Sequence, residues 1–181
     1  MHRRDILEKL ANFIPRDPRD INCRDQFIEF IKTNPNCFER SLEIGHITGS
    51  AWIVNPARDR FLLTFHKKLE LWLQLGGHAD GNPNVLEVAL GEAREESGIY
   101  RVEPLSDQIY DLDLHRIPEH KGVPEHFHYD VRFICEADDT VPLIISDESH
   151  DLRWLTAAEV LERTSEESIL RMLRKTPKRI K

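Results

Sequence analysis

The stretch from Gly76 to Ile99, GGHADGNPNVLEVALGEAREESGI, constrains this chain more than any other part of it. A glycine pair leads into a loop, and the loop leads into a segment of helical periodicity that stops at Gly98. Asn82 or Asn84 can cap such a helix at its start, and glycine is a common residue at its end. The sequence therefore predicts a loop followed by one well-bounded helix.

The predicted helix carries apolar and acidic side chains on neighbouring arcs. Glu92, Glu95 and Glu96 are spaced i, i+3 and i+4, which gathers them on one arc. Like charges this close repel each other, and Mg²⁺ or Mn²⁺ would relieve the repulsion because hard ions prefer oxygen ligands. A solvated acidic face is the alternative interpretation of a bare EAREE segment. The apolar arc contains Val85, Leu86, Ala89, Leu90, Ala93 and Ser97.

The glycine pair and the helix together resemble the signature of the Nudix hydrolase family. That signature is written G-x5-E-x7-R-E-U-x-E-E-x-G-U, where U is an apolar residue, and the chain keeps its spacing without insertion or deletion. The matched positions are Gly77, Glu92, Ala93, Glu95, Glu96, Gly98 and Ile99. The combination of GGHADG with EHFHYDVRF is similar to a particular branch of the family. The resemblance to this branch does not identify a substrate.

The chain departs from the signature at two positions. Pro83 stands where the family has its first Glu, an outer metal ligand, and Gly91 stands where it has an Arg that orients the carboxylates. Asp80 and Glu87 are nearby carboxylates, but neither occupies the matching position. Gly91 also weakens the helix by about 1 kcal/mol relative to alanine. These two departures leave the expected fold unchanged. They put in doubt the rate of hydrolysis and whether the chain is active at all.

The resemblance implies an α/β fold, the Nudix α/β/α sandwich with a mixed β-sheet, and a metal-dependent hydrolase. Glu92, Glu95 and Glu96 would hold Mg²⁺ or Mn²⁺. The base would be Glu92, as in the family, or a residue of a late loop such as Glu148. The backbone of Gly76 and Gly77 would let phosphates approach closely. The expected substrate is a nucleoside diphosphate linked to another group.

The resemblance covers about Ser41 to Lys175, so we expect a Nudix domain at 41–181 and an N-terminal helical extension at 1–40. Periodicity predicts helices at 5–14 and about 21–33 in the extension. This pair would pack on the main domain as a structural element, a lid or an oligomer contact. Further strands are predicted at 46–54, 60–65, 72–75, 100–110, 112–115, 127–135 and 152–155, and helices at about 157–163 and 166–174.

A second polar cluster is predicted downstream of the helix. In EHFHYDVRF, alternation sends His126, His128 and Arg132 to one face of a strand. If that strand forms a hairpin with YDLDLH, His115 converges with His126 and His128, and imidazole with carboxylate suits zinc, iron or manganese. A polar outer face with histidines bonded to acids is the simpler interpretation. Arg132 is a natural phosphate partner and equally a member of a structural ion pair.

Composition and charge exclude several classes of partner. The 181 residues carry a formal net charge of −7, which argues against a nucleic-acid polymer. The chain lacks an apolar run of about 18 residues, and its start, MHRRDILEKL, lacks the apolar segment of a signal peptide. We therefore expect no membrane and a cytoplasmic location, which three widely spaced cysteines also fit. A homodimer is expected only by analogy with the family.

Three functions stay open at this point. The first is the diphosphate hydrolase that uses the helix carboxylates. The second is a catalytically weak or inactive Nudix-fold module that binds a nucleotide, which Pro83 and Gly91 motivate. The third is an enzyme whose principal metal sits in the histidine cluster. Nucleoside triphosphates, nucleotide sugars, dinucleotides and prenyl diphosphates all stay open as substrates.

Overall fold

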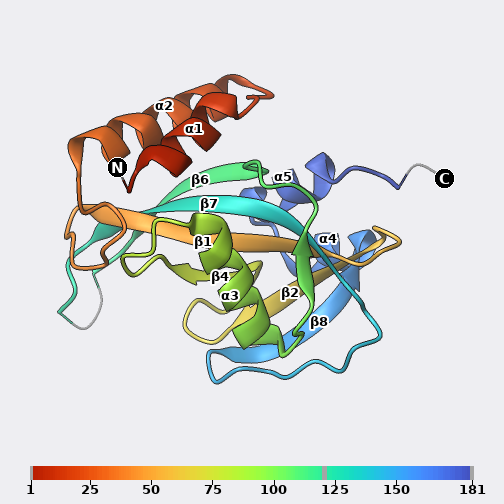
Figure 1. Cartoon of the computed structure of the whole chain (residues 1–181). Helices are drawn as coiled ribbons and strands as arrows, with labels where there is room; N and C mark the ends of the chain where they lie inside the picture. Colours follow the sequence, from red (N-terminus) through yellow and green to blue (C-terminus); the bar gives the residue numbers. More distant parts are fainter. Residues whose placement is uncertain (1, 120–121, 180–181) are drawn as a thin grey trace.

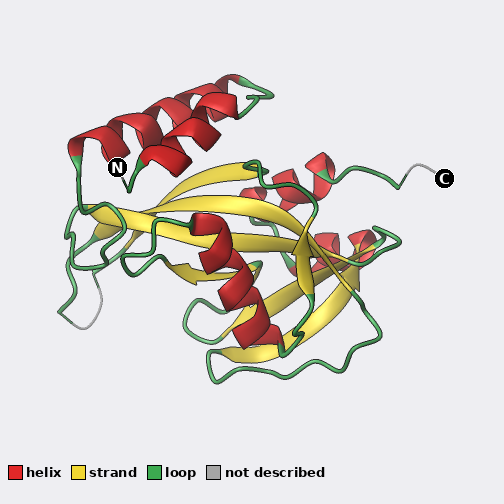
Figure 2. Cartoon of the chain, viewed as in Figure 1, coloured by secondary structure: helices red, strands yellow, loops and turns green. Residues whose placement is uncertain are grey.

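The computed structural model describes residues 2–119 and 122–179 and has a mixed β-sheet with helices on both faces (Figure 1, Figure 2). This confirms the expected α/β architecture. The helices are α1 (Arg4–Asn12), α2 (Pro18–Thr33), α3 (Val85–Ser97), α4 (Ala157–Arg163) and α5 (Glu167–Lys175). The strands are β1 (Gly45–Val54), β2 (Arg60–His66), β3 (Leu71–Leu73), β4 (Leu75–His78), β5 (Val102–Pro104), β6 (Asp111–Ile117), β7 (His126–Ala137) and β8 (Ser149–Thr156).

Strand β1 is the centre of the sheet. It pairs in parallel with β7 over its whole length, and on its other side it pairs antiparallel with β4 and then with β2. Strands β5 and β6 pair with β7, while β3 and β8 pair with β2. Strand β1 therefore lies between the two halves of the sheet, one built on β7 and the other on β2.

Two apolar cores lie on the two faces of the sheet. Alternation along β1 sends Ile47 and Ala51 into the core under α1, α2 and α3. The same alternation sends Trp52 into the second core, which α4 and α5 close. Toward the starts of β1 and β7, the same face of β1 carries the buried polar side chains of His46, Thr48 and Ser50 in place of apolar ones.

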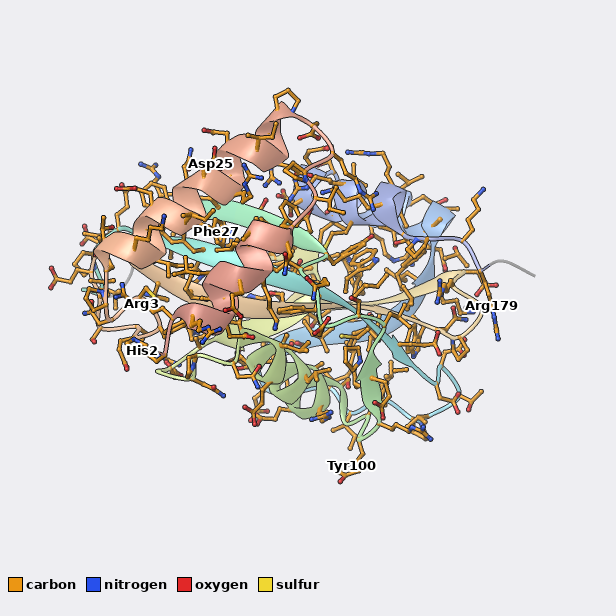
Figure 3. The ribbon with its side chains drawn as sticks, turned by 45° about the horizontal axis from the view of Figure 1, so that its top comes forward. His2, Arg3, Asp25, Phe27, Tyr100 and Arg179 are labelled. Atoms are coloured by element: carbon orange, nitrogen blue, oxygen red, sulfur yellow. The ribbon has the colours of Figure 1, made fainter. Side chains whose placement is uncertain are left out.

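The N-terminal helices belong to the first core. Phe27 and Phe30 of α2 pack on Tyr129 of β7, with ring centroids 5.2 Å and 3.8 Å apart, respectively. Figure 3 shows α1 and α2 lying over the strands, with Phe27 on the longer helix. Buried Asp20 accepts a hydrogen bond from Lys175 of α5 at 3.0 Å, which ties the extension to the far end of the chain. The extension at 1–40 thus has no separate core among the described residues.

The predicted strand at 100–110 is wrong for most of its length. Only Val102–Pro104 is a strand. The N–H groups of Leu105 and Tyr110 still donate to carbonyls of β7, each at 2.9 Å, but between them a turn interrupts the strand, in which Ser106 accepts a hydrogen bond from the Gln108 N–H at 3.1 Å. The segment at 72–75 is divided between β3 and β4, which Gln74 separates, and the other predicted elements are found within a few residues. Helix α2 begins earlier than expected because Asp17 caps it and Pro18 fits its first turn.

Across residues 2–119 and 122–179, no helix has both the length and the apolar character needed to cross a bilayer.

Replacing Phe27 tests whether the extension is integral to the domain. Phe27 is fully buried, so Phe27→Ala should lower the free energy of unfolding by about 3–5 kcal/mol, within one cooperative transition. Ile21→Ala on the same helix, where the side chain is 46% exposed, should change it by less than about 0.5 kcal/mol. Urea unfolding followed by circular dichroism measures both. A separate early transition for the extension would contradict the shared core.

Candidate functional site

Helix α3 presents the predicted carboxylates beside the sheet. Asn84 caps its start by accepting a hydrogen bond from the Glu87 N–H at 3.3 Å, and Gly98 ends it in the left-handed conformation with φ 73°. The apolar arc of the helix is buried against β1. Glu92 and Glu96 are half-buried beside it, and Glu95 is exposed.

The glycine pair of β4 lies directly against these carboxylates. The Gly76 N–H donates a hydrogen bond to Glu96 Oε2 at 3.2 Å. A Cβ on Gly77 would lie only 2.4 Å from the carboxylate carbon of Glu92. The missing side chain at Gly77 therefore lets the Glu92 carboxylate lie against the backbone of β4. The predicted glycines and glutamates are thus brought together.

The electrostatics of the cluster favour a cation. Burial, followed by the neighbouring charge of Glu92, raises the pKa of Glu96 to about 8. Burial and then Glu95 raise the pKa of Glu92. Among the described residues, Glu92, Glu95 and Glu96 form no salt bridge. Clustered carboxylates without a cationic partner are a suitable ligand set for a hard divalent ion.

Glu148 lies near the helix carboxylates although it is far away in sequence. It belongs to the loop before β8, its side chain is exposed, and its carbonyl accepts a hydrogen bond from the Lys67 N–H at 2.9 Å. Its charge contributes to the raised pKa of both Glu92 and Glu96. The loop thus supplies a further carboxylate that faces the cluster.

Arg40 is a cation near the site that sequence reasoning missed. It forms a bidentate ion pair with Asp80, and its charge opposes the raised pKa of Glu92. Gly91, where the signature has an arginine, faces open space, with no atom within 4 Å of a built Cβ. Arg40 precedes the whole signature, so no spacing rule could have identified it.

Arg132 lies in a buried ion-pair network. Only 2% of it is exposed, and its guanidinium is 2.7 Å from Asp130, 3.4 Å from Asp113 and 3.6 Å from Asp111. A contact between Arg132 and a substrate phosphate stays a prediction. The three aspartates around the guanidinium favour the other interpretation, in which Arg132 belongs to a structural ion pair. Asp130 also accepts hydrogen bonds from Ser50 at 2.7 Å and Thr48 at 3.0 Å.

Histidines form a row across four neighbouring strands. His115 of β6 stands opposite His128 of β7, which stands opposite His46 of β1. His78, at the end of β4, completes the row, and its ring centroid is 5.0 Å from those of both His46 and His128. The predicted hairpin and its convergence of His115, His126 and His128 are found.

The closest potential ligand set differs from the predicted one. One nitrogen each of His46, His78 and His128 lies within 4.8 Å of the other two. Burial lowers the pKa of His46 to about 4 and strongly lowers that of His128, so both rings are neutral at pH 7. Sequence reasoning missed His46 and His78, because only the parallel pairing of β1 with β7 reveals the first. The second stands inside the GGHADG motif and was available as a signal.

The raised pKa of Glu96 makes stability depend on pH in the metal-free protein. Glu96 binds its proton more tightly in the folded chain, so it lowers the free energy of unfolding as pH rises from 4.5 through about 8. Glu96→Gln should therefore be more stable than wild type at pH 8, by on the order of 2 kcal/mol, and equally stable near pH 4. Urea unfolding of chelator-treated protein measures this, with the exposed Glu162→Gln as control. Equal stability of Glu96→Gln and wild type at pH 8 would contradict the raised pKa of Glu96.

Solved structures of known proteins share this architecture. The Ap4A hydrolase of C. elegans, in a binary complex, superposes with a TM-score of 0.57 at 18% identity, over 71% of this chain and 93% of the other. The dihydroneopterin triphosphate pyrophosphohydrolase of E. coli gives 0.55 at 15% identity, over 71% and 92%. The NUDIX domain of Shewanella oneidensis NrtR, complexed with ADP ribose, gives 0.54 at 16% identity, over 81% and 94%. At these identities the likeness shows the fold alone.

Sequence comparison assigns the family. No curated protein matches the chain significantly in sequence. The family model of the NUDIX domain, in contrast, matches residues 46–175, which include the glycine pair, all of α3 and Glu148. The chain therefore belongs to the Nudix family.

Proposed function

We propose that the chain is a metal-dependent hydrolase that cleaves a diphosphate bond in a nucleoside diphosphate linked to another group. The observation that carries this proposal is the approach of the Gly76 and Gly77 backbone to the carboxylates of Glu96 and Glu92. A phosphate chain is polyanionic, so it can lie beside carboxylates only where a cation is shared between them. The glycine backbone leaves room for such a chain at that place.

Mg²⁺ or Mn²⁺ fits the ligand set of Glu92, Glu95 and Glu96. Glu96 accepts one backbone hydrogen bond, at 3.2 Å from the Gly76 nitrogen, and has no cationic partner among the described residues. When bound, the ion would neutralise charge on the diphosphate oxygens and lower the pKa of a water molecule. The Gly76 N–H holds the Glu96 carboxylate in place for this role.

Two carboxylates are candidates for the base that accepts the proton of the attacking water. Glu92 has a raised pKa, which makes it a stronger base than an ordinary glutamate. Glu148 is exposed on the loop before β8, close enough to the cluster that its charge raises the pKa of Glu96. Arg40 places positive charge close to both Glu92 and Glu148.

The structural neighbours support a nucleotide or related diphosphate as the substrate class. Two of them are named for Ap4A and dihydroneopterin triphosphate, and a third holds ADP ribose. Each of these compounds has a chain of at least two phosphates attached to a larger organic group. We infer a small-molecule partner of this kind, a cytoplasmic location and, by family analogy, a homodimer.

A nucleotide-binding module without turnover is the second candidate. It is favoured by the two departures from the signature, because Pro83 cannot ligate a metal and Gly91 cannot orient a carboxylate. Asp80, a nearby carboxylate, is instead paired with Arg40. Binding without product release would distinguish this candidate from the hydrolase.

Turnover on a panel of nucleotides tests the proposed function. We expect Mg²⁺- or Mn²⁺-dependent product release from at least one nucleoside diphosphate derivative, and a loss of roughly 100-fold or more in Glu96→Gln. Glu162→Gln, the same change on an exposed helical residue, should retain full activity. Chromatography of the products measures the rates. Absence of turnover on every substrate would favour the binding module.

A pair of glycine substitutions tests the loop independently of the substrate. In Gly77→Ala the three atoms nearest the new methyl group all belong to the flexible end of Glu92, so the protein should fold but bind Mn²⁺ roughly tenfold more weakly. Gly91→Ala places its methyl group in open space on α3. It should leave Mn²⁺ affinity unchanged and raise stability by up to about 1 kcal/mol.

Calorimetric titration of Mn²⁺ and urea unfolding measure the two effects. Wild-type Mn²⁺ affinity in Gly77→Ala would show that the Glu92 carboxylate is not a ligand.

A further inference from the structure

We propose that His46, His78 and His128 form a binding site for a divalent transition ion of the zinc class, separate from the carboxylate cluster of α3. One nitrogen of each ring lies within 4.8 Å of the others. Nitrogens that bind the same zinc ion lie at most about 4 Å apart. Small side-chain rotations that move the ring nitrogens by about 1 Å would therefore bring all three within binding distance of one ion. The site does not rest on the proposed function.

The burial of these rings supports a ligand that binds their free nitrogens. His46 is only 3% exposed, yet within residues 2–119 and 122–179 neither of its ring nitrogens has a hydrogen-bond partner, and the same holds for Nε2 of His128. The Leu42 carbonyl lies near the His46 ring but outside hydrogen-bond geometry. A buried polar atom without a partner is costly, so such atoms are nearly always satisfied in proteins. An ion held by the lone pairs of these rings would satisfy them.

Two further histidines stand around the set with one nitrogen already engaged. His126 Nδ1 is 2.8 Å from the Pro124 carbonyl, and its ring lies 5.1 Å from that of His46. A nitrogen that donates to a carbonyl leaves Nε2 as the free acceptor, which makes His126 a candidate fourth ligand. His115 Nδ1 is 3.3 Å from Asp113, the carboxylate–histidine arrangement found around protein-bound metals.

The donor set selects the kind of ion. Imidazole nitrogens suit zinc and related transition ions, whereas Mg²⁺ prefers carboxylates and water. Three strands supply the three ligands, since His46 lies on β1, His78 on β4 and His128 on β7. A bound ion would therefore join the ends of these strands and fix the position of the loop that follows Gly77.

Zinc and cobalt titrations of untagged, chelator-treated full-length protein test the site. We expect one equivalent of Zn²⁺ to bind and raise the melting temperature, because the ion binds only the folded chain. Co²⁺ should give the intense visible absorption of a low-coordinate nitrogen site, in place of the weak absorption of an octahedral oxygen site. Absence of stoichiometric Zn²⁺ binding, or a weak octahedral spectrum, would overturn the proposal.

Variants locate the ion within the protein. His46→Gln and His78→Gln should weaken Zn²⁺ binding by more than roughly 100-fold, and His115→Gln by roughly 10–100-fold, as expected for an outer residue. His2→Gln and Glu96→Gln should bind Zn²⁺ as wild type does. His78 is only half-buried, so His78→Gln tests the ligand set even if the change at His46 disturbs folding. Loss of the ion in Glu96→Gln, or its retention in His78→Gln, would overturn the separate site.

Discussion

The parallel pairing of β1 with β7 is the constraint on which the rest of the structure depends. Its register runs unbroken from Gly45 opposite Phe127 to Val54 opposite Glu136, and a shift by one residue would move the side chains of the shifted strand to the opposite face of the sheet. Gly49 adds a second requirement on the same strand. A Cβ there would lie 2.7 Å from the Val85 carbonyl oxygen, and its absence lets α3 approach β1 closely. The position of the helix carboxylates follows from this packing.

Some charged side chains away from solvent are fully paired with opposite charges, and others are not. Arg132 is paired with three aspartates, and Arg171 makes a second bidentate pair with Asp111 at 3.0 Å and 2.7 Å. Such full pairing compensates the loss of water and leaves no capacity for a ligand. Glu96 is half-buried and has no cationic partner in the part of the chain that the structure describes, and its pKa is raised as a result. Uncompensated charge of this kind marks a place where a partner is expected to bind.

Local pattern was sufficient to predict most of the fold but only part of the site. The period of α3, its cap at Asn84 and its stop at Gly98 are all encoded within a few residues, so the carboxylate arc was predictable. Arg40 and His46 reach their positions only through the packing of distant segments, and no local rule indicates that. The segment 105–110 has strand-like residues, but the turn at Ser106 overrides that propensity.

The two candidate metal sites are linked through the backbone of β4. Gly77 lies against Glu92, and the next residue, His78, projects from β4 into the histidine cluster. Hard carboxylate oxygens and imidazole nitrogens select different ions, so occupancy of one site need not compete with occupancy of the other. An ion on the histidines would immobilise the residue that follows Gly77. It would thereby preorganise the glycine pair of β4 that lies against Glu92 and Glu96, the arrangement that phosphate chemistry at those carboxylates requires.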